Sequence, residues 1–172
     1  MQKINFIPFP IINTQNYLLR KLEISDAPAI FKIRSNTQIA KDIDRMPAKL
    51  NEEALQFIIK INEGICNSTV IYWGIESKSN SNIVGTITLW KISKDKESAE
   101  IGFELLPNYQ SCGIMQEVIP QVIKFGFRVL GLKTIIGEVV PENVKSIMLL
   151  KKFGFKFERK LSNTHIYTLF KN

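Results

Sequence analysis

The sequence predicts an α/β protein of the α+β type, in which helices flank a mixed, mostly antiparallel central sheet. Residues 70–106 contain three successive segments rich in β-branched and aromatic residues, which favours antiparallel strands. Residues 113–153 then alternate between a helical pattern, a strand and a second helix, which indicates a strand–helix–strand crossover. The expected order of elements is therefore β-α-α-β-β-β-α-β-α-β-β.

The first half of the chain is assigned from apolar spacing and from helix-capping residues. Residues 17–22 are expected to form the first strand, and Ser25-Asp26 to begin the first helix. A second helix is expected to begin at Asn51 and to stop at Gly64, because asparagine caps helix starts and glycine favours helix ends. Three strands are expected to follow at 70–75, 83–90 and 98–106.

The second half begins with a long helix at 113–130, which has apolar residues at a spacing of three and four. Pro120 lies inside this helix and is expected to kink it, because proline lacks a backbone N–H. A strand at 134–140 and a helix at 142–153 should follow, and two final strands are expected at 155–159 and 165–170.

The length and composition predict one soluble globular domain. A chain of 172 residues suits a single core, here taken as residues 1–172, with 1–16 as an extended lead-in to the first strand. The hydrophobic fraction of 45% and the charged fraction of 23% are ordinary for this class. The chain has no internal repeat and no glycine/serine linker that would mark a domain boundary.

The formal net charge of +7 favours an anionic partner, such as nucleic acid, an acidic membrane or a phosphate-bearing cofactor. A generally basic surface without a partner is the alternative. The lysines and arginines are scattered rather than clustered, so direct nucleic-acid binding is not expected. The apolar stretch at 6–12 is too short to span a membrane, so no membrane partner is expected either.

The cysteine and histidine content argues against a metal site. Cys66 and Cys112 are far apart, and His165 is the single histidine, so no Cys/His cluster is expected and no metal cofactor is predicted. Two separated cysteines are consistent with a reducing, cytoplasmic compartment. His165 is expected to have a structural or surface role.

Two strand-to-helix junctions are the candidate ligand sites. At the first, Gly113 opens a helix, where unpaired backbone N–H groups and the helix dipole attract anions. A pyrophosphate would fit there, although such a glycine is also consistent with a simple turn. At the second, Asn143 and Ser146 lie near a helix start, where they would either contact an amide-bearing ligand or simply cap the helix. Two such junctions at neighbouring strand ends indicate a ligand cleft.

Three segments of the chain, in the correct order and spacing, match one known family. The segment Gln110-x-x-Gly113-x-Met115 resembles the coenzyme A pyrophosphate loop of GNAT acetyltransferases, written Q/R-x-x-G-x-G/A. The segment from Asn143 to Phe155, and the opening at residues 19–27, resemble the branch that includes the bacterial ribosomal-protein N-terminal acetyltransferases. The resemblance covers residues 17–170 and implies a GNAT-like fold.

The resemblance implies an N-acetyltransferase that moves the acetyl group of acetyl-CoA by direct attack onto a primary amine. The acceptor would be a protein N-terminus or a small-molecule amine, and the protein a monomer or homodimer. Backbone groups after Gln110 would hold the pyrophosphate, the end of the strand would bind the pantetheine arm, and Asn143 would contact that arm. The implied cofactor-binding residues are Phe103, Glu104, Leu105, Gln110, Ser111, Cys112, Gly113, Ile114, Met115, Asn143 and Ser146.

Two residues are the catalytic candidates under this resemblance. Glu100 matches the strand glutamate that serves as general base in some members, since an amine must lose a proton before it attacks. A cross-strand ion pair is the alternative role for Glu100. Glu104 is the next candidate base. Glu138, on the adjacent strand, would either bind a cationic acceptor or simply be solvated. Ser146 is expected to act on the leaving thiolate.

Three positions depart from the family pattern. Leu150 stands where many members have a tyrosine acid. Met115 stands where the family has glycine or alanine and is expected to crowd the phosphate loop. Cys112 stands where a basic residue is common. Met115 and Cys112 support an alternative function, a non-catalytic GNAT-like binding module with a degenerate cofactor loop. A nucleotide-binding protein is a weaker alternative, because the chain lacks G-x-x-x-x-G-K-[ST] and G-x-G-x-x-G.

Overall fold

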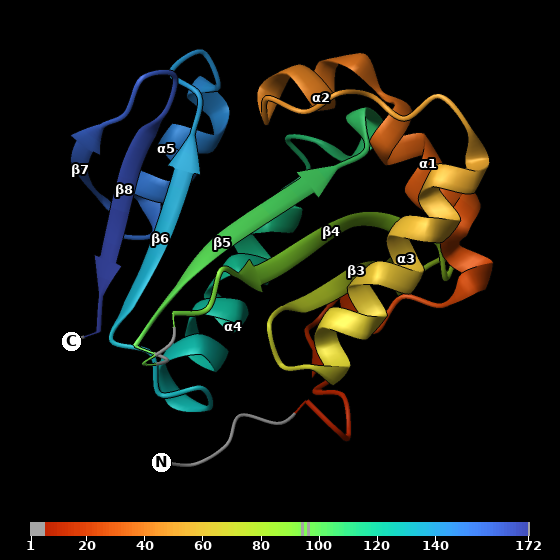
Figure 1. Cartoon of the computed structure of the whole chain (residues 1–172), viewed down its shortest axis with the longest axis horizontal. Helices are drawn as coiled ribbons and strands as arrows, with labels where there is room; N and C mark the ends of the chain where they lie inside the picture. The colour runs from red at the N-terminus through yellow and green to blue at the C-terminus, as the bar shows by residue number, and fades with distance from the viewer. Residues whose placement is uncertain (1–5, 94, 96, 172) are drawn as a thin grey trace.

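The central element is one sheet with the strand order β1-β2-β3-β4-β5-β6-β8-β7 in the computed structural model, which describes residues 6–93, 95 and 97–171 (Figure 1). Strands β5 and β6 are parallel to each other, whereas the other neighbouring pairs are antiparallel. The strands are β1 (Ile12–Asn13), β2 (Tyr17–Arg20), β3 (Ile71–Ser77), β4 (Ile83–Trp90), β5 (Ser98–Leu105), β6 (Thr134–Val139), β7 (Lys156–Lys160) and β8 (His165–Phe170).

The helices lie on both faces of this sheet. Short 3₁₀ turns, η1 (Ile24–Asp26) and η2 (Pro107–Tyr109), precede the first helix and follow β5. The α-helices are α1 (Ala27–Ser35), α2 (Thr37–Asp42), α3 (Asn51–Cys66), α4 (Ile114–Arg128) and α5 (Val144–Lys152). Among the described residues, no helix combines the length and the apolar character needed to cross a membrane.

The mixed, mostly antiparallel sheet flanked by helices confirms the predicted fold class. Two elements were not predicted, β1 and α2. Strand β1 lies within the expected lead-in, and Pro10 in the same segment accepts a hydrogen bond from the indole of Trp73 at 2.7 Å. Helix α2 is capped by Asn36, whose side chain accepts from the backbone N–H of Ile39 at 3.0 Å. A six-residue helix carries too few apolar positions to show a period.

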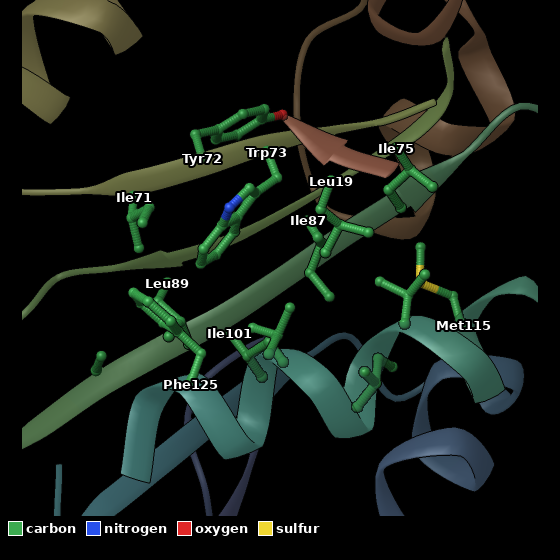
Figure 2. Close-up of a cluster of buried hydrophobic side chains, with 14 of the residues drawn as sticks. Leu19, Ile71, Tyr72, Trp73, Ile75, Ile87, Leu89, Ile101, Met115 and Phe125 are labelled. Atoms are coloured by element: carbon green, nitrogen blue, oxygen red, sulfur yellow. The ribbon is translucent and has the colours of Figure 1, made fainter. Parts of the chain in front are cut away.

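The two faces of the sheet differ in which helices cover them. Trp73 points toward α4, where its ring meets that of Phe125 edge-on at a centroid distance of 5.3 Å. The neighbouring Tyr72 points to the opposite face and meets Phe57 of α3 at 5.5 Å. Figure 2 shows these two side chains leaving β3 in opposite directions. Alternation along each strand therefore separates an α4/α5 face from an α1/α3 face.

Helix α4 packs against the sheet through a stripe of apolar side chains. Val118, Ile119 and Val122 are fully buried beneath the strands. The helix continues through Pro120 to Arg128, so the proline does not end it. Burial of this stripe fixes how the first turn of α4 is placed relative to the end of β5.

The sheet opens between β5 and β6. These two strands pair only over Ser98–Glu100 and Thr134–Ile136. Beyond that point β5 stays paired with β4 up to Leu105, and β6 stays paired with β8. Figure 1 shows β5 and β6 together at one end and apart at the other. The second half of β5 therefore has a backbone edge that β6 does not cover.

Candidate active site

A cleft of about 610 Å³ lies where β5 separates from β6. Its walls come from five segments: α2, the end of β5, the loop after η2, the first turn of α4 and the helix α5 with its N-cap. The lining residues are Ile39, Asp42, Ile43, Phe103, Glu104, Leu105, Gln110, Ser111, Gly113, Ile114, Met115, Gln116, Asn143, Lys145, Ser146, Met148, Leu149 and Lys152.

The structure brings the predicted cofactor-binding residues together around this cleft. All of them line it except Cys112, which is exposed on the loop with its thiol 3.4 Å from the carbonyl oxygen of Gln110. The sequence pattern did not identify the contribution of α2 or of the lysines on α5. Helix α2 is short and carries no motif, and lysine on a helix surface is too common to mark a site.

The loop before α4 contains two residues with a left-handed backbone and, in the described part of the chain, a run of backbone N–H groups that point to no protein acceptor. Ser111 and Gly113 both adopt the left-handed region, at φ values of 61° and 81°. Within the described ranges, no protein acceptor pairs with the backbone N–H groups from Ser111 to Met115. A Cβ built on Gly113 would meet no protein atom within 4 Å, so the cleft is open at this glycine. The side chain of Gln110 donates to the carbonyl oxygen of Leu105 at 3.2 Å and holds the loop against β5.

Met115 does not crowd this loop, and the expectation that it would is wrong. Its side chain is 6% exposed and packs into the core below the sheet, near Ile75 (Figure 2). In the first turn of a helix, position 115 faces the sheet rather than the solvent, so a large apolar side chain is accommodated there. Met115 is nevertheless one of the residues that line the cleft.

Asn143 caps one helix at the edge of the cleft and connects it to another. Its Oδ1 accepts from the backbone N–H of Ser146 at 3.1 Å, which caps α5. Its Nδ2 donates to the carbonyl oxygen of Asp42 at 3.1 Å, which ties α5 to the end of α2. The capping role considered for Asn143 is therefore present, and the same side chain fixes the distance between two walls of the cleft.

Positive charge reaches the cleft from α5. Lys145 and Lys152 both line it, and the Lys152 ammonium donates to the side chain of Gln116 on α4 at 2.9 Å. The basic residue expected beside the glycine loop is replaced by Cys112. The described structure instead supplies two lysines from the neighbouring helix, at the mouth between α4 and α5.

Glu100 and Glu138 lie on the α1/α3 face, beside the point where β5 and β6 separate. The ammonium of Lys91 is 2.8 Å from Glu100 and 3.5 Å from Glu138. Lys91 also lies over the Trp90 ring, 4.4 Å from its centroid. Burial raises the pKa of Glu100, and the Lys91 ammonium offsets part of that rise. The ion pair considered for Glu100 is present, with a lysine that is half exposed.

Glu104 lies two strand positions beyond Gly102 on the same face and also borders the cleft. Arg45 reaches it from the loop after α2, with Nη1 at 3.0 Å from Oε1. Burial raises the pKa of Glu104, and the charges of Arg45 and Arg34 act in the opposite direction. Both carboxylates are thus ion-paired, Glu104 with the largely buried Arg45 and Glu100 with the half-exposed Lys91.

His165 packs edge-on against Phe157 at 5.4 Å and lies outside the cleft. Both cysteines are free and exposed. Leu150 is buried in the core, where its methyl groups occupy the space that a side chain at position 137 would need. Buried leucine at this position supplies no proton donor, whereas Ser146 on the same helix lines the cleft.

The arrangement fits coenzyme A. Unpaired N–H groups at the start of a helix suit a pyrophosphate, and the free backbone edge of β5 suits an amide-bearing arm lying alongside it as an added strand. Between these features the cleft leads to the point where β5 and β6 separate, next to Glu100 and Glu104.

Comparison with known families and sequences agrees with this geometry. A family model described as an acetyltransferase (GNAT) domain matches residues 16–156. The uncharacterized N-acetyltransferase YoaA of Bacillus subtilis (strain 168) is 33% identical over 87% of this chain and 85% of its own length. The uncharacterized N-acetyltransferase p20 of Bacillus licheniformis is 30% identical over 84% of this chain and 82% of its own length.

Solved structures share the fold at lower sequence identity. A putative ribosomal-protein-serine acetyltransferase from Vibrio cholerae superposes with a TM-score of 0.83 and 21% identity, over 95% of this chain and 99% of that chain. A spermidine N-acetyltransferase from Vibrio cholerae, in complex with CoA and spermine, gives a TM-score of 0.80 and 22% identity, over 90% and 95%. These neighbours differ in their acceptors, so the shared fold leaves the acceptor open.

Proposed function

The chain belongs to the GNAT acetyltransferase family and is an acyltransferase, and we propose that it transfers the acetyl group of acetyl-CoA to a primary amine. The acceptor is a protein N-terminus or a small-molecule amine. One observation carries the proposal: the unpaired N–H groups of the loop before α4 and the free edge of β5 border the same cleft. Residues 1–172 act as one catalytic domain in this proposal.

Binding of acetyl-CoA is assigned to backbone groups more than to side chains. The N–H groups from Ser111 to Met115 bind the pyrophosphate, and the edge of β5 from Phe103 to Leu105 binds the pantetheine arm. Lys145 and Lys152 add positive charge at the mouth of the cleft. Asn143 keeps α5 and α2 at the spacing that the arm requires.

The proton of the acceptor amine passes to Glu100. An amine is mostly protonated at neutral pH and becomes a nucleophile only after losing that proton. The raised pKa of Glu100 brings its carboxylate closer to the range in which a general base works well. Because Lys91 is 52% exposed, an acceptor ammonium displaces it from Glu100 at little cost. Ser146 donates a hydrogen bond to the departing thiolate, and no covalent enzyme intermediate is required.

The alternative of a non-catalytic binding module rested on Met115 and Cys112. Met115 is buried below the sheet, and lysines on α5 line the cleft near the position that Cys112 leaves uncharged. Neither residue therefore favours a degenerate cofactor loop. Free, exposed Cys66 and Cys112 support a reducing, cytoplasmic location.

Isothermal titration with acetyl-CoA and, separately, with ATP tests the proposal directly. We expect micromolar binding of acetyl-CoA and no binding of ATP, followed by acetylation of at least one amine in a mixed panel of peptides, amino acids and polyamines. A folded protein that does not bind acetyl-CoA contradicts the proposal. Binding without turnover of any amine favours the non-catalytic module.

A further inference from the structure

Two arginines face one glutamate on the α1/α3 side of the sheet. Arg45 contacts both carboxylate oxygens of Glu104 through Nη1, at 3.0 and 3.3 Å. Arg34, from the last turn of α1, stacks on the ring of Phe57 with its guanidinium carbon 3.9 Å from the centroid. Both arginines are half-buried, and the side chain of Glu104 is 12% exposed.

This cluster has an excess of positive charge. In Arg45, Nε and Nη2 are buried and have no hydrogen-bond partner. Among residues 6–93, 95 and 97–171, Arg34 has no side-chain hydrogen bond and no ion pair. Burial and the nearby charge of Arg45 both lower the pKa of Arg34, although an arginine remains charged in proteins. Buried N–H donors without a partner are costly, so Arg45 has donors available for a further acceptor.

In the described part of the chain, two further polar side chains act on these arginines, those of Glu53 and Tyr72. Glu53 is near Arg34, but its Oε1 accepts from the backbone N–H groups of Lys49 and Leu50 at 2.9 and 3.0 Å. The hydroxyl of Tyr72 is bonded to Thr86 at 2.9 Å. Neither side chain forms a hydrogen bond or ion pair with Arg34 or Arg45 among the described residues.

The cluster lies beside the expected path of the acceptor. Glu100 and Glu104 share one face of β5 and are about 13 Å apart, at about 3.3 Å per residue. Gly102 lies midway between them, and the side chains of Thr88 and Trp90 flank it: a Cβ added there would be 3.2 Å from Thr88 and 3.7 Å from the Trp90 indole. An amine above Gly102 is thus near Glu100 on one side and near the arginines on the other.

We propose that Arg34 and Arg45 bind a carboxylate of the acceptor, so that the acceptor is an amine with a carboxylate a few bonds away. The guanidinium group presents its donors in a planar fork that matches a carboxylate, and an ammonium would be repelled. This inference rests on the proposed function and sharpens it, because it selects against polyamines. The carboxylate comes from a free amino acid or from an acidic residue close to a peptide N-terminus.

Matched acceptors test the inference. The value of kcat/KM is measured for two matched pairs of acceptors: γ-aminobutyrate against n-butylamine, and Ala-Glu-Ala-amide against Ala-Gln-Ala-amide. Spermidine is measured beside them as a polyamine acceptor without a carboxylate. The carboxylate-bearing member of at least one pair should be preferred by at least about tenfold, the effect expected for a charged hydrogen bond. The pair that shows the preference identifies the source of the carboxylate.

Arg34→Met should remove this preference and leave the packing on Phe57 largely intact. We expect kcat/KM to fall at least about tenfold for the acidic acceptor and to stay within about threefold for its neutral partner. Arg34→Lys should restore part of the preference, since it keeps the charge and loses the fork. Lys32→Met, an exposed position on the same helix, is the control and should change neither value.

Two outcomes overturn the inference. One is that spermidine or the neutral amines are the better acceptors, or that no carboxylate-bearing amine is acetylated. The other is that Arg34→Met lowers both members of a pair equally while its melting temperature and acetyl-CoA affinity, measured by titration, are unchanged. Failure of the wild-type protein to bind acetyl-CoA would instead contradict the proposed function, so the two failures are distinguishable.

Discussion

The two sides of β5 are built from different kinds of groups. The α4/α5 side presents backbone N–H groups, a glycine in the left-handed region and a free strand edge around one cleft. The α1/α3 side presents charged side chains that arrive from segments far apart in the sequence, such as Arg45, Lys91 and Glu138. The binding groups on the α4/α5 side belong to the backbone, so their geometry depends on a few glycines and helix caps; we call this the backbone-built face. The binding groups on the α1/α3 side belong to side chains, so a single substitution can change its specificity; we call this the side-chain-built face. The first suits a constant co-substrate and the second a variable acceptor.

The largest expected effect concerns the side-chain-built face. Glu100→Gln removes the proposed proton acceptor, so kcat should fall by about 100-fold to 10,000-fold while acetyl-CoA affinity is retained. Steady-state kinetics together with titration separate the two effects. Glu97→Gln, on the exposed loop beside β5, is the matched control and should leave kcat unchanged. If Glu100→Gln lowered acetyl-CoA affinity as much as it lowered kcat, the separation of cofactor binding from proton transfer on the two sides of β5 would be contradicted.

The next effect concerns the backbone-built face. Gly113→Val puts a branched side chain on a left-handed residue where the cleft is open, and acetyl-CoA should bind at least about 100-fold more weakly, since several charge-assisted hydrogen bonds are lost. Gly131→Val is the control, because Gly131 also has a positive φ, of 73°, and a Cβ added there would likewise meet no atom within 4 Å. Similar acetyl-CoA affinities for the two variants would contradict a role for Gly113 beyond backbone strain.

A smaller effect is expected at the joint between the cleft walls. Asn143→Ala removes the cap of α5 and the bond to Asp42, so the free energy of unfolding should fall by about 1 kcal/mol. Acetyl-CoA binding should weaken as well, because α2 and α5 lose their connection. Asn36→Ala removes the cap of α2 and should cost similar stability with less effect on binding. Urea denaturation and titration of both variants test this difference.

The smallest effect is expected at Lys91. Its ammonium lowers the pKa of Glu100 against the rise caused by burial, so Lys91→Met should raise that pKa further. A base must be deprotonated to act, so the acidic limb of the kcat/KM profile should move to higher pH. An ion pair with a half-exposed lysine is worth at most about 1 kcal/mol, so the change is modest. A limb that moves to lower pH, or does not move, would argue against Glu100 as the base.

The sequence by itself determined the fold class, and it located the glycine that opens α4. Strand propensity in residues 70–106 and the glycine at position 113 are local features of the sequence. The folded chain keeps the backbone conformations that these features favour. The same is true of the Asn143 cap. Met115 was misjudged because a motif position does not reveal which side of a helix it will occupy relative to the sheet.

Tertiary structure alone decided which charged side chains meet on the α1/α3 side of β5. Arg45 and Glu104 are 59 positions apart in the sequence, and Lys91 and Glu138 are 47 apart. Periodicity in the sequence therefore predicts neither contact. Helix α2 is too short to predict, yet it places Ile39 and Asp42 at the cleft. Backbone sites follow local sequence because their atoms are adjacent along the chain, whereas charge clusters arise only when folding brings distant side chains together.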